Sequence, residues 1–167
     1  MSTLIVDTLG GEKGREIAAR IERMDQEVRV IHTEGKKILP CIGCNNCWLK
    51  TPGICSVQDD YAEILKAYLE YDNILYISGT ALGFVDYKMK NVIDRVLPLV
   101  TMLIHIVNGQ ERHVGRYSKK YRFGLVYAGE ADHAYLNRWL ERVAVNFEGT
   151  SIGAFREEEI AEVKKCI

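Results

Sequence analysis

Short apolar runs alternate with helical patterns along the whole 167-residue chain, and this alternation limits the folds open to it. A continuous apolar run is typical of a strand that is covered on both faces, as in a parallel sheet. Strands separated by helices pair in parallel through right-handed crossovers. The sequence therefore predicts an α/β fold in one domain, 1–167, with strands at 3–7, 27–33, 73–78, 122–127 and 150–155.

The segments between the predicted strands carry apolar residues at the spacing of one helix face. Ser56 and Asp59 form a predicted capping box at the start of the second helix, and Pro98 is expected to end the third. Gly149 is expected to close the fourth helix, and the acidic tail from Glu157 predicts a short last one. The apolar stripes are Ile17, Ala18, Ile21 and Met24; Tyr61, Ile64, Leu65 and Tyr68; Met89, Val92, Ile93 and Val96; and Leu136, Trp139, Leu140, Val143 and Phe147.

The charge balance and the short apolar runs exclude two classes of protein. The net charge is -1, whereas a nucleic-acid-binding surface needs a basic excess. No apolar run approaches the ~20 residues that cross a bilayer, and the first residues lack the apolar stretch of a signal peptide. We therefore expect a cytoplasmic protein that binds neither nucleic acid nor membrane.

Ligands of open α/β sheets bind outside the carboxyl ends of the strands, where the strand order reverses. The candidate loops are those after the first, third and fourth predicted strands, together with a cysteine-rich loop after the second. That loop holds four of the five cysteines, at Cys41, Cys44, Cys47 and Cys55. In a reducing compartment such a cluster indicates a metal, redox chemistry or buried thiols rather than disulfides.

Two segments in these loops carry a recognisable pattern. The stretch CIGCNNCWLKTPGICSVQDDYAEI contains C-x-G-C-x-x-C, then Gly-x-Cys, then a paired acid that opens a helix. The stretch ISGTALGFVDYKMKNVIDR contains a small-residue loop that ends in Gly and an aromatic, then Met-Lys and a downstream Asp-Arg. The positions are Cys41, Gly43, Cys44, Cys47, Gly53, Cys55, Asp59, Asp60, Gly83, Phe84, Met89, Lys90, Asp94 and Arg95.

Together these segments resemble the family of NADPH-dependent FMN reductases and iron–sulfur flavoproteins, and the resemblance covers most of the chain in order. It implies a flavodoxin-like three-layer sandwich with a five-stranded parallel sheet in the order 2-1-3-4-5. It also implies an FMN-dependent oxidoreductase that passes electrons from NAD(P)H to a small acceptor or a redox partner. The cofactor supplies that chemistry, and no side chain is assigned as catalytic.

The loop after the first strand is the candidate phosphate site. The family's phosphate loop usually reads Gly-Ser-x-Arg, whereas this chain has DTLGGEKGRE. Small residues before a helix allow backbone N–H groups to approach an anion, which the helix dipole favours. The candidate FMN-binding residues are Thr8, Gly10, Gly11, Lys13, Gly14 and Arg15, and the alternative is a Gly-rich turn that only changes the chain direction.

The loop after the third strand corresponds by this resemblance to the one that meets the flavin ring. Its residues are Gly79, Thr80, Ala81, Leu82, Gly83 and Phe84, and Gly129 after the fourth strand is a further candidate. The alternative is an ordinary strand-to-helix turn.

The four clustered cysteines leave three interpretations open. The spacing C-x2-C-x2-C-x7-C resembles the [4Fe–4S] ligands of iron–sulfur flavoproteins. A tetrahedral zinc site is the second interpretation, and thiols that pack beside the flavin site without metal are the third.

The apolar stretch 97–107 exceeds what one helix face needs. We expect it either to pack on a second subunit, which makes the protein a homo-oligomer, or to be buried in its own chain. The leading hypothesis is the NAD(P)H-dependent flavin oxidoreductase. Its alternatives are an electron carrier with a [4Fe–4S] cluster, and a binding or structural module that has lost tight FMN binding.

Overall fold

The structure, a computed structural model, describes residues 2–23 and 27–167, so Met24 of the first predicted stripe lies outside the described residues. Its main sheet has the strand order β2-β1-β3-β7-β8, and every pair along this path is parallel. The predicted strand order is therefore confirmed. The strands are β1 (Thr3–Asp7), β2 (Val28–His32), β3 (Asn73–Ala81), β7 (Arg122–Ala128) and β8 (Thr150–Arg156).

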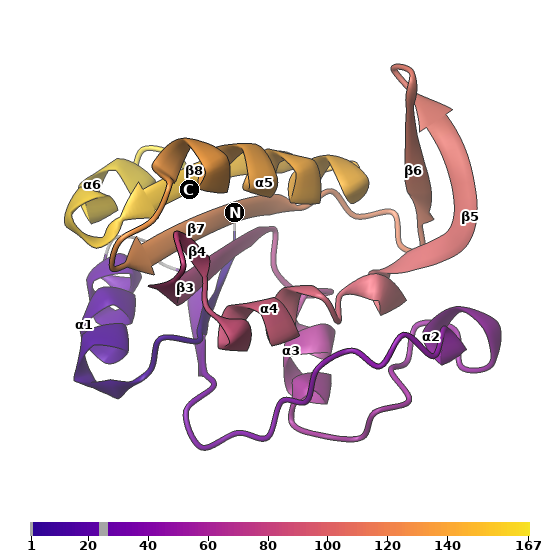
Figure 1. The fold of residues 1–167 in the computed structure, drawn as a ribbon, viewed down its shortest axis with the longest axis horizontal. Coiled ribbons are helices and arrows are strands. Elements are labelled where there is room, and N and C mark those ends of the chain that lie inside the picture. Colours follow the sequence, from indigo (N-terminus) through magenta and orange to yellow (C-terminus); the bar gives the residue numbers. More distant parts are fainter. Residues whose placement is uncertain (1, 24–26) are drawn as a thin grey trace.

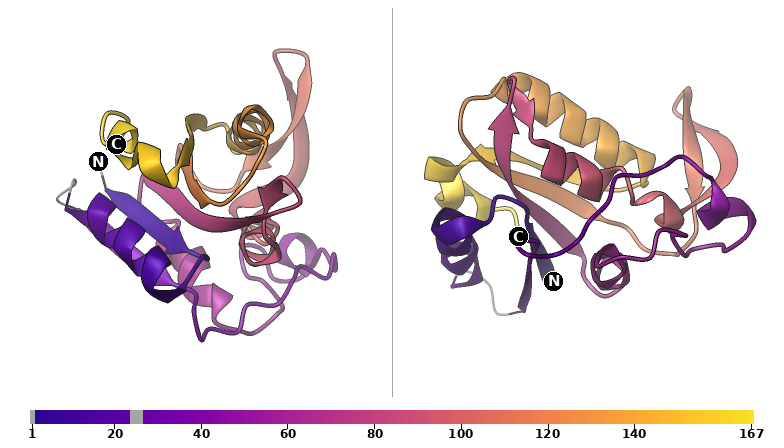
Figure 2. Two further views of the ribbon diagram at one scale, coloured as in Figure 1. Left: turned by 60° about the vertical axis from the view of Figure 1, so that its left-hand side comes forward. Right: turned by 60° about the horizontal axis from the view of Figure 1, so that its bottom comes forward.

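Helices cover both faces of this sheet (Figures 1 and 2). Neighbouring side chains of a strand point to opposite faces, so Ile5 packs with one set of helices and Leu4 with the other. One layer holds α1 (Gly11–Glu22) and α6 (Ile160–Val163), the latter preceded by a 3-10 turn, η2 (Glu157–Glu159). The opposite layer holds α3 (Tyr61–Ala67), α4 (Tyr87–Ile93) and α5 (His133–Asn146).

Helix starts differ between the predicted and observed structure at α3. The Asp86 and Asp132 carboxylates cap α4 and α5 by accepting from the amides of the third residue along. The predicted capping box of Ser56 and Asp59 is wrong, because the residue that precedes α3 is Asp60 and it makes no side-chain cap. The Asp59 carboxylate accepts from the Tyr61 amide through one oxygen and pairs with buried Arg95 through the other, so its main partner is a buried cation.

A two-stranded hairpin stands away from the main sheet (Figure 1). It follows a 3-10 turn, η1 (Leu97–Leu99), and consists of β5 (Val100–Val107) and antiparallel β6 (Gln110–Gly115). The expected burial of the stretch 97–107 in its own chain is wrong for its middle, where apolar side chains remain exposed. The side chains that lie exposed there are Met102, Leu103, Ile104 and Ile106.

The segment between β2 and α3 contains little regular structure. Its one helix within the described residues is α2 (Asn46–Leu49), which is a single turn. A further short strand, β4 (Phe84–Val85), pairs antiparallel with the end of β3. Among residues 2–23 and 27–167, none of the helices has the length and apolar character needed to span a membrane.

Gly14 is a position where α1 lies very close to β1. A Cβ at residue 14 would lie 2.6 Å from both carboxylate oxygens of buried Asp7. We expect Gly14→Ala to lower the free energy of unfolding by about 1–3 kcal/mol, since the core must shift to admit the methyl group. Urea denaturation measures this, with Glu16→Ala on the exposed side of the same helix as the control. Equal midpoints for the two variants would contradict the close approach.

Candidate functional site

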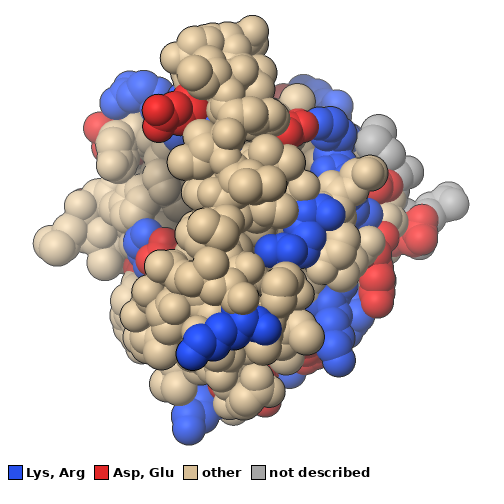
Figure 3. All heavy atoms as spheres, turned by 90° about the vertical axis from the view of Figure 1, so that its right-hand side faces the viewer, with Lys and Arg blue, Asp and Glu red and all other residues tan. Residues whose placement is uncertain are grey.

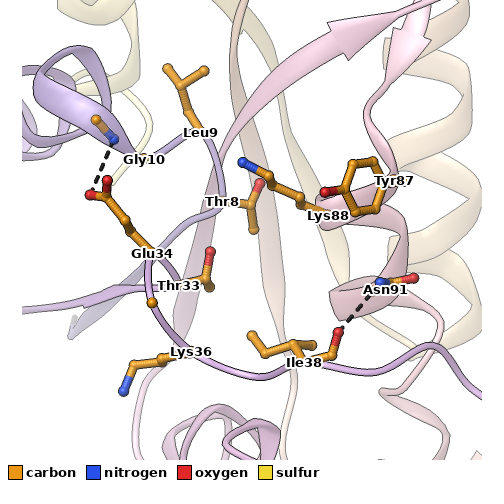
Figure 4. A pocket seen from close by; sticks show the side chains of 12 residues that line it. Thr8, Leu9, Gly10, Thr33, Glu34, Lys36, Ile38, Tyr87, Lys88 and Asn91 are labelled. Atoms are coloured by element: carbon orange, nitrogen blue, oxygen red, sulfur yellow. Dashed lines mark hydrogen bonds between the residues drawn. The ribbon is translucent and has the colours of Figure 1, made fainter.

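A pocket of about 350 Å³ opens at the carboxyl ends of β1 and β2, beside the first turn of α4 (Figure 4). This is the edge of the sheet where the connection reverses direction, because β2 and β3 lie on opposite sides of β1. The pocket is lined by Thr8, Leu9, Gly10, Gly11, Thr33, Glu34, Gly35, Lys36, Ile38, Tyr87, Lys88 and Asn91.

Two backbone amides of the loop before α1 bind carboxylates of the protein itself. Gly10 donates to Asp7 Oδ1 over 3.1 Å, and Gly11 donates to Glu34 Oε2 over 3.3 Å. Arg15 also donates to Glu34, over 2.6 Å. The hydrogen bonds from Arg15 and from the Gly11 amide hold the pKa of Glu34 below its usual value. At this end of the pocket a side-chain carboxylate is therefore bound by a helix-start amide and a guanidinium.

The carboxylate of Asp7 fixes the floor of this loop. It is fully buried, and its second oxygen lies 2.7 Å from Nδ1 of His32 at the end of β2. The backbone carbonyl of Asp7 accepts from both the amide and the hydroxyl of Thr33. These bonds join the ends of β1 and β2, so the loop before α1 and the loop after β2 are held against each other.

The other residues of the predicted phosphate loop make contacts of different kinds. Thr8 lines the pocket, but its hydroxyl donates to the Ile77 carbonyl. Lys13 pairs with Glu157 over 2.7 Å, toward η2 and α6. Gly14 lies beneath the loop against Asp7. Of the six predicted phosphate-loop residues, Thr8, Gly10 and Gly11 line the pocket and Arg15 reaches it through Glu34.

The predicted flavin-ring loop forms the end of β3 and its turn into β4, next to the pocket rather than in its lining. A Cβ at Gly79 would lie 3.4 Å from the side chain of Leu9, which does line the pocket. Thr80 lies beside Gly129, since its Oγ1 would be 2.5 Å from a Cβ there.

Beyond Thr80 the same loop turns outward and then back toward α5. Ala81 pairs with Phe84 across the turn, and Leu82 is fully exposed with a φ of 52°. The Gly83 carbonyl accepts from the Asp132 amide over 3.1 Å. Phe84 packs edge-on against Trp139, with ring centroids 5.0 Å apart. The structure thus brings the β3 and β7 loops together, and Gly79 of the β3 loop lies beside the pocket.

Several pocket residues were not predicted from the sequence. Glu34 and Lys36 follow β2, while Tyr87, Lys88 and Asn91 come from α4. Figure 4 shows Lys88 extending from α4 into the pocket. The rule that ligands bind at strand ends applies to the loop after β2 as much as to the loop after β1. The charged residues at the start of that loop, Glu34 and Lys36, precede its cysteines and belong to no motif.

The four clustered cysteines meet around one small cavity. Cys41, Cys44, Cys47 and Cys55 all line a space of about 20 Å³. Burial, and then the neighbouring thiols of Cys55, Cys41 and Cys44, raise the pKa of Cys47. The Ser56 hydroxyl, 3.1 Å from Cys44 Sγ, lowers the pKa of Cys44.

The described residues contain no group of three or more His, Cys, Asp or Glu arranged to hold a single metal ion.

Comparison with known proteins connects this chain to flavoproteins by sequence. No protein-family model matches it. It is 39% identical over 85 residues to an iron–sulfur flavoprotein of Methanocaldococcus jannaschii. This match covers 51% of this chain and 43% of the relative. It is 37% identical over 79 residues to an iron–sulfur flavoprotein of Archaeoglobus fulgidus. This match covers 47% of this chain and 38% of the relative. The matches thus span less than half the length of these curated relatives.

Solved structures share the fold over nearly the whole chain at low identity. An azoreductase from Bacillus anthracis has a TM-score of 0.60 at 12% identity, covering 99% of this chain and 97% of its own. A general stress protein 14 from Treponema denticola, solved with FMN, has a TM-score of 0.55 at 13% identity, covering 99% and 94%. An NADPH-quinone reductase from P. pentosaceus has a TM-score of 0.57 at 9% identity, covering 100% and 98%. The resemblance found in the sequence is confirmed: the chain has the flavodoxin-like fold of flavin reductases and a sequence similar to that of iron–sulfur flavoproteins.

Proposed function

We propose that this protein is an FMN-dependent oxidoreductase whose flavin phosphate binds at the loop between β1 and α1. The observation that carries the proposal is the carboxylate of Glu34, which accepts from the Gly11 amide and from Arg15. A carboxylate held by an amide at a helix start and by a guanidinium is a stand-in for a phosphate oxygen. The FMN complex of a protein with the same fold supports the identity of the ligand.

The chain's own residues divide between the two ends of such a ligand. Gly11 and Arg15 would hold the phosphate once Glu34 has moved aside, with Gly10 lining the pocket beside them and Lys88 adding positive charge from α4. The β3 loop lies beside the pocket at Gly79 and contacts the β7 loop at Gly129, and both loops would border the flavin ring. The residues proposed for the ring are Gly79, Thr80, Ala81, Leu82, Gly83, Phe84 and Gly129.

FMN, when bound, supplies hydride and electron transfer. We propose NAD(P)H as the donor and a small molecule, such as a quinone, or a redox protein as the acceptor. The protein orients the cofactor, excludes water from one side of it and tunes its potential through the polar groups at the strand ends. We place this activity in the cytoplasm, where reducing conditions keep thiols such as the five free cysteines unoxidised.

The second candidate function is electron transfer through an iron–sulfur cluster. The supporting observation is that all four clustered cysteines line the same cavity, and the sequence relatives are iron–sulfur flavoproteins by name. Cys41, Cys44, Cys47 and Cys55 would hold a [4Fe–4S] cluster through their thiolates. Such a centre exchanges single electrons, so it would connect the flavin to a one-electron partner.

Absorbance together with iron and sulfide analysis of protein purified without oxygen tests both proposals. We expect a flavin spectrum, restored by added FMN after the cofactor is stripped, and reduction of that flavin by NADH or NADPH. Broad brown absorbance with iron and sulfide is expected if the cysteines hold a cluster. A colourless protein that takes up neither FMN nor iron would contradict both proposals and favour the module without tight FMN binding.

We also propose that the protein is a homo-oligomer whose subunits meet through the β5–β6 hairpin. Seen from the hairpin side, the projecting top of the molecule and much of the middle of this face carry few charged side chains (Figure 3). Ile104 is 58% and Ile106 is 74% exposed, and isolated two-stranded ribbons are only marginally stable in water. Sedimentation velocity is expected to show an oligomer that Ile106→Asp shifts toward monomer. Glu16→Lys on the exposed side of α1 is the control, and a monomeric wild-type chain would contradict the proposal.

A further inference from the structure

Arg95 is a buried cation whose partners all lie in or at the border of the cysteine segment, defined here as residues 39–59. The residue follows α4, and its side chain is 1% exposed. One guanidinium nitrogen, Nη1, donates to Asp59 Oδ2 over 2.6 Å and to the Leu39 carbonyl over 3.1 Å. The other, Nη2, donates to the Val57 carbonyl over 3.1 Å and to Cys55 Sγ over 3.3 Å. The guanidinium also lies over the ring of Tyr61, 4.4 Å from its centroid.

These contacts hold the two ends of the cysteine segment together. Leu39 precedes the first cysteine, whereas Val57 and Asp59 follow the last of the four. Asp59 completes the closure, because its carboxylate also accepts from the amides of Leu39, over 2.8 Å, and of Tyr61, over 3.2 Å. The planar fork of an arginine can satisfy several acceptors at fixed angles, which a lysine ammonium cannot do.

Cys55 differs from the other three cysteines in its surroundings. Seven residues separate it from Cys47, and it lines the same cavity as the other three. The Arg95 guanidinium is the hydrogen-bond donor at its sulfur. A cationic donor stabilises the negative charge of a thiolate and restricts the positions that the sulfur can take.

We propose that Arg95 is a positioning residue that presents Cys55 to the metal centre held by the four cysteines. The proposal rests on the cluster put forward under Proposed function. Arg95 lies two residues beyond the end of α4, so its hydrogen bonds link the cysteine segment to the helix that borders the pocket. The pocket residues Tyr87, Lys88 and Asn91 belong to that same helix.

A double-mutant cycle on the full chain tests whether Arg95 acts through Cys55. Wild type, Arg95→Lys, Cys55→Ser and the double variant are reconstituted with iron and sulfide without oxygen, and retained iron is measured against rising chelator. Arg95→Lys keeps a cation for Asp59, and we expect it to lower iron retention about tenfold. The double variant is expected to retain as much iron as Cys55→Ser alone. Wild-type retention in Arg95→Lys, or losses that multiply in the double variant, would overturn the proposal.

A measurement on metal-free protein separates this proposal from the cluster proposal. Alkylation of Cys55 relative to Cys44 is followed by mass spectrometry at about pH 10, where ordinary thiols are ionised and the rate reports access to the sulfur. Arg95→Lys is expected to raise this ratio about tenfold through the lost contact. Arg29→Lys, whose partners are Glu63 and Glu70, is the matched control and should leave it unchanged.

The combined outcomes are distinguishable. A wild type that binds no iron, with an altered Cys55 ratio in Arg95→Lys, rejects the cluster and leaves Cys55 positioned by Arg95. An unchanged ratio with normal iron retention rejects the role of Arg95 and leaves the cluster. If Arg95→Lys does not fold, the paired variant Asp59→Asn/Arg95→Gln carries the same test, because it leaves no unpaired charge buried.

Discussion

Replacing Asp59 by Asn is expected to lower the free energy of unfolding by about 3–5 kcal/mol. The carboxylate of Asp59 is fully buried and lies 2.6 Å from Arg95, which is 1% exposed. The substitution keeps the size of the side chain but leaves the guanidinium charge buried without an ionic partner. Denaturation in urea, followed by circular dichroism, measures the loss as a shift of the midpoint at constant slope.

Two further variants show whether burial of the pair is the cause. Glu63→Gln removes partly exposed ion pairs with Arg29 and Lys36 and is expected to cost about 1 kcal/mol or less. The neutral pair Asp59→Asn/Arg95→Gln is expected to recover part of the stability that Asp59→Asn loses. If Asp59→Asn is as stable as Glu63→Gln, the buried pair does not stabilise the fold.

Acid should reproduce this loss in the wild-type protein. Burial alone would raise the pKa of Asp59, but hydrogen bonds from Arg95 and the Leu39 amide bring that pKa below its usual value. A carboxylate whose pKa is lower in the folded state contributes stability that is complete above its unfolded pKa of about 4. That contribution disappears as the pH falls through the folded pKa. The stability difference between wild type and Asp59→Asn is therefore expected to shrink below about pH 4.

Replacing Glu34 by Gln is expected to raise the affinity for FMN about tenfold, the order of one charge-assisted hydrogen bond that no longer competes. In the structure the Glu34 carboxylate accepts from the Gly11 amide and from Arg15, the two donors proposed for the phosphate. Glutamine keeps the length of the side chain but carries no charge to repel the phosphate. Quenching of flavin fluorescence during titration measures the dissociation constant.

The control and the pH dependence make this result specific. Glu16→Gln removes an exposed acid from the same helix and is expected to leave FMN affinity unchanged. Because the pKa of Glu34 is lowered by Arg15 and Gly11, its carboxylate stays ionised at neutral pH. The ratio of the wild-type and Glu34→Gln affinities is therefore expected to stay constant between about pH 6 and 8. Equal affinities would show that Glu34 does not compete for the phosphate site.

The layered fold could be predicted because its strands are covered on both faces. Runs such as 73–78 are nearly continuous in apolar residues, and in a chain of alternating elements this pattern is typical of a central parallel strand. The hairpin of β5 and β6 was not predicted because its apolar stretch does not alternate with polar residues. The signal that could have found it is Asn108–Gly109, where both residues have positive φ, as a type I′ turn requires.

The site could be predicted in part, and the missing part is tertiary. The resemblance pointed to the loops after β1 and β3, and glycines there indicated a close approach of backbone to ligand. Nothing in the local sequence shows that Glu34 reaches the Gly11 amide, because the two residues lie in loops joined only by the pairing of β1 and β2. The predicted helix cap at Asp59 was wrong for the same reason. Its partner Arg95 is far away in sequence and adjacent only in the folded chain.

The closure of the cysteine segment by Arg95 also sets an order of events during synthesis. Cys55 leaves the ribosome before its partner, which is 40 residues further along. At the usual rates of elongation this interval lasts roughly 2–8 seconds. During that time Cys55 is on a nascent chain without the guanidinium that contacts its sulfur. If the four cysteines hold the proposed cluster, its assembly would follow the translation of Arg95.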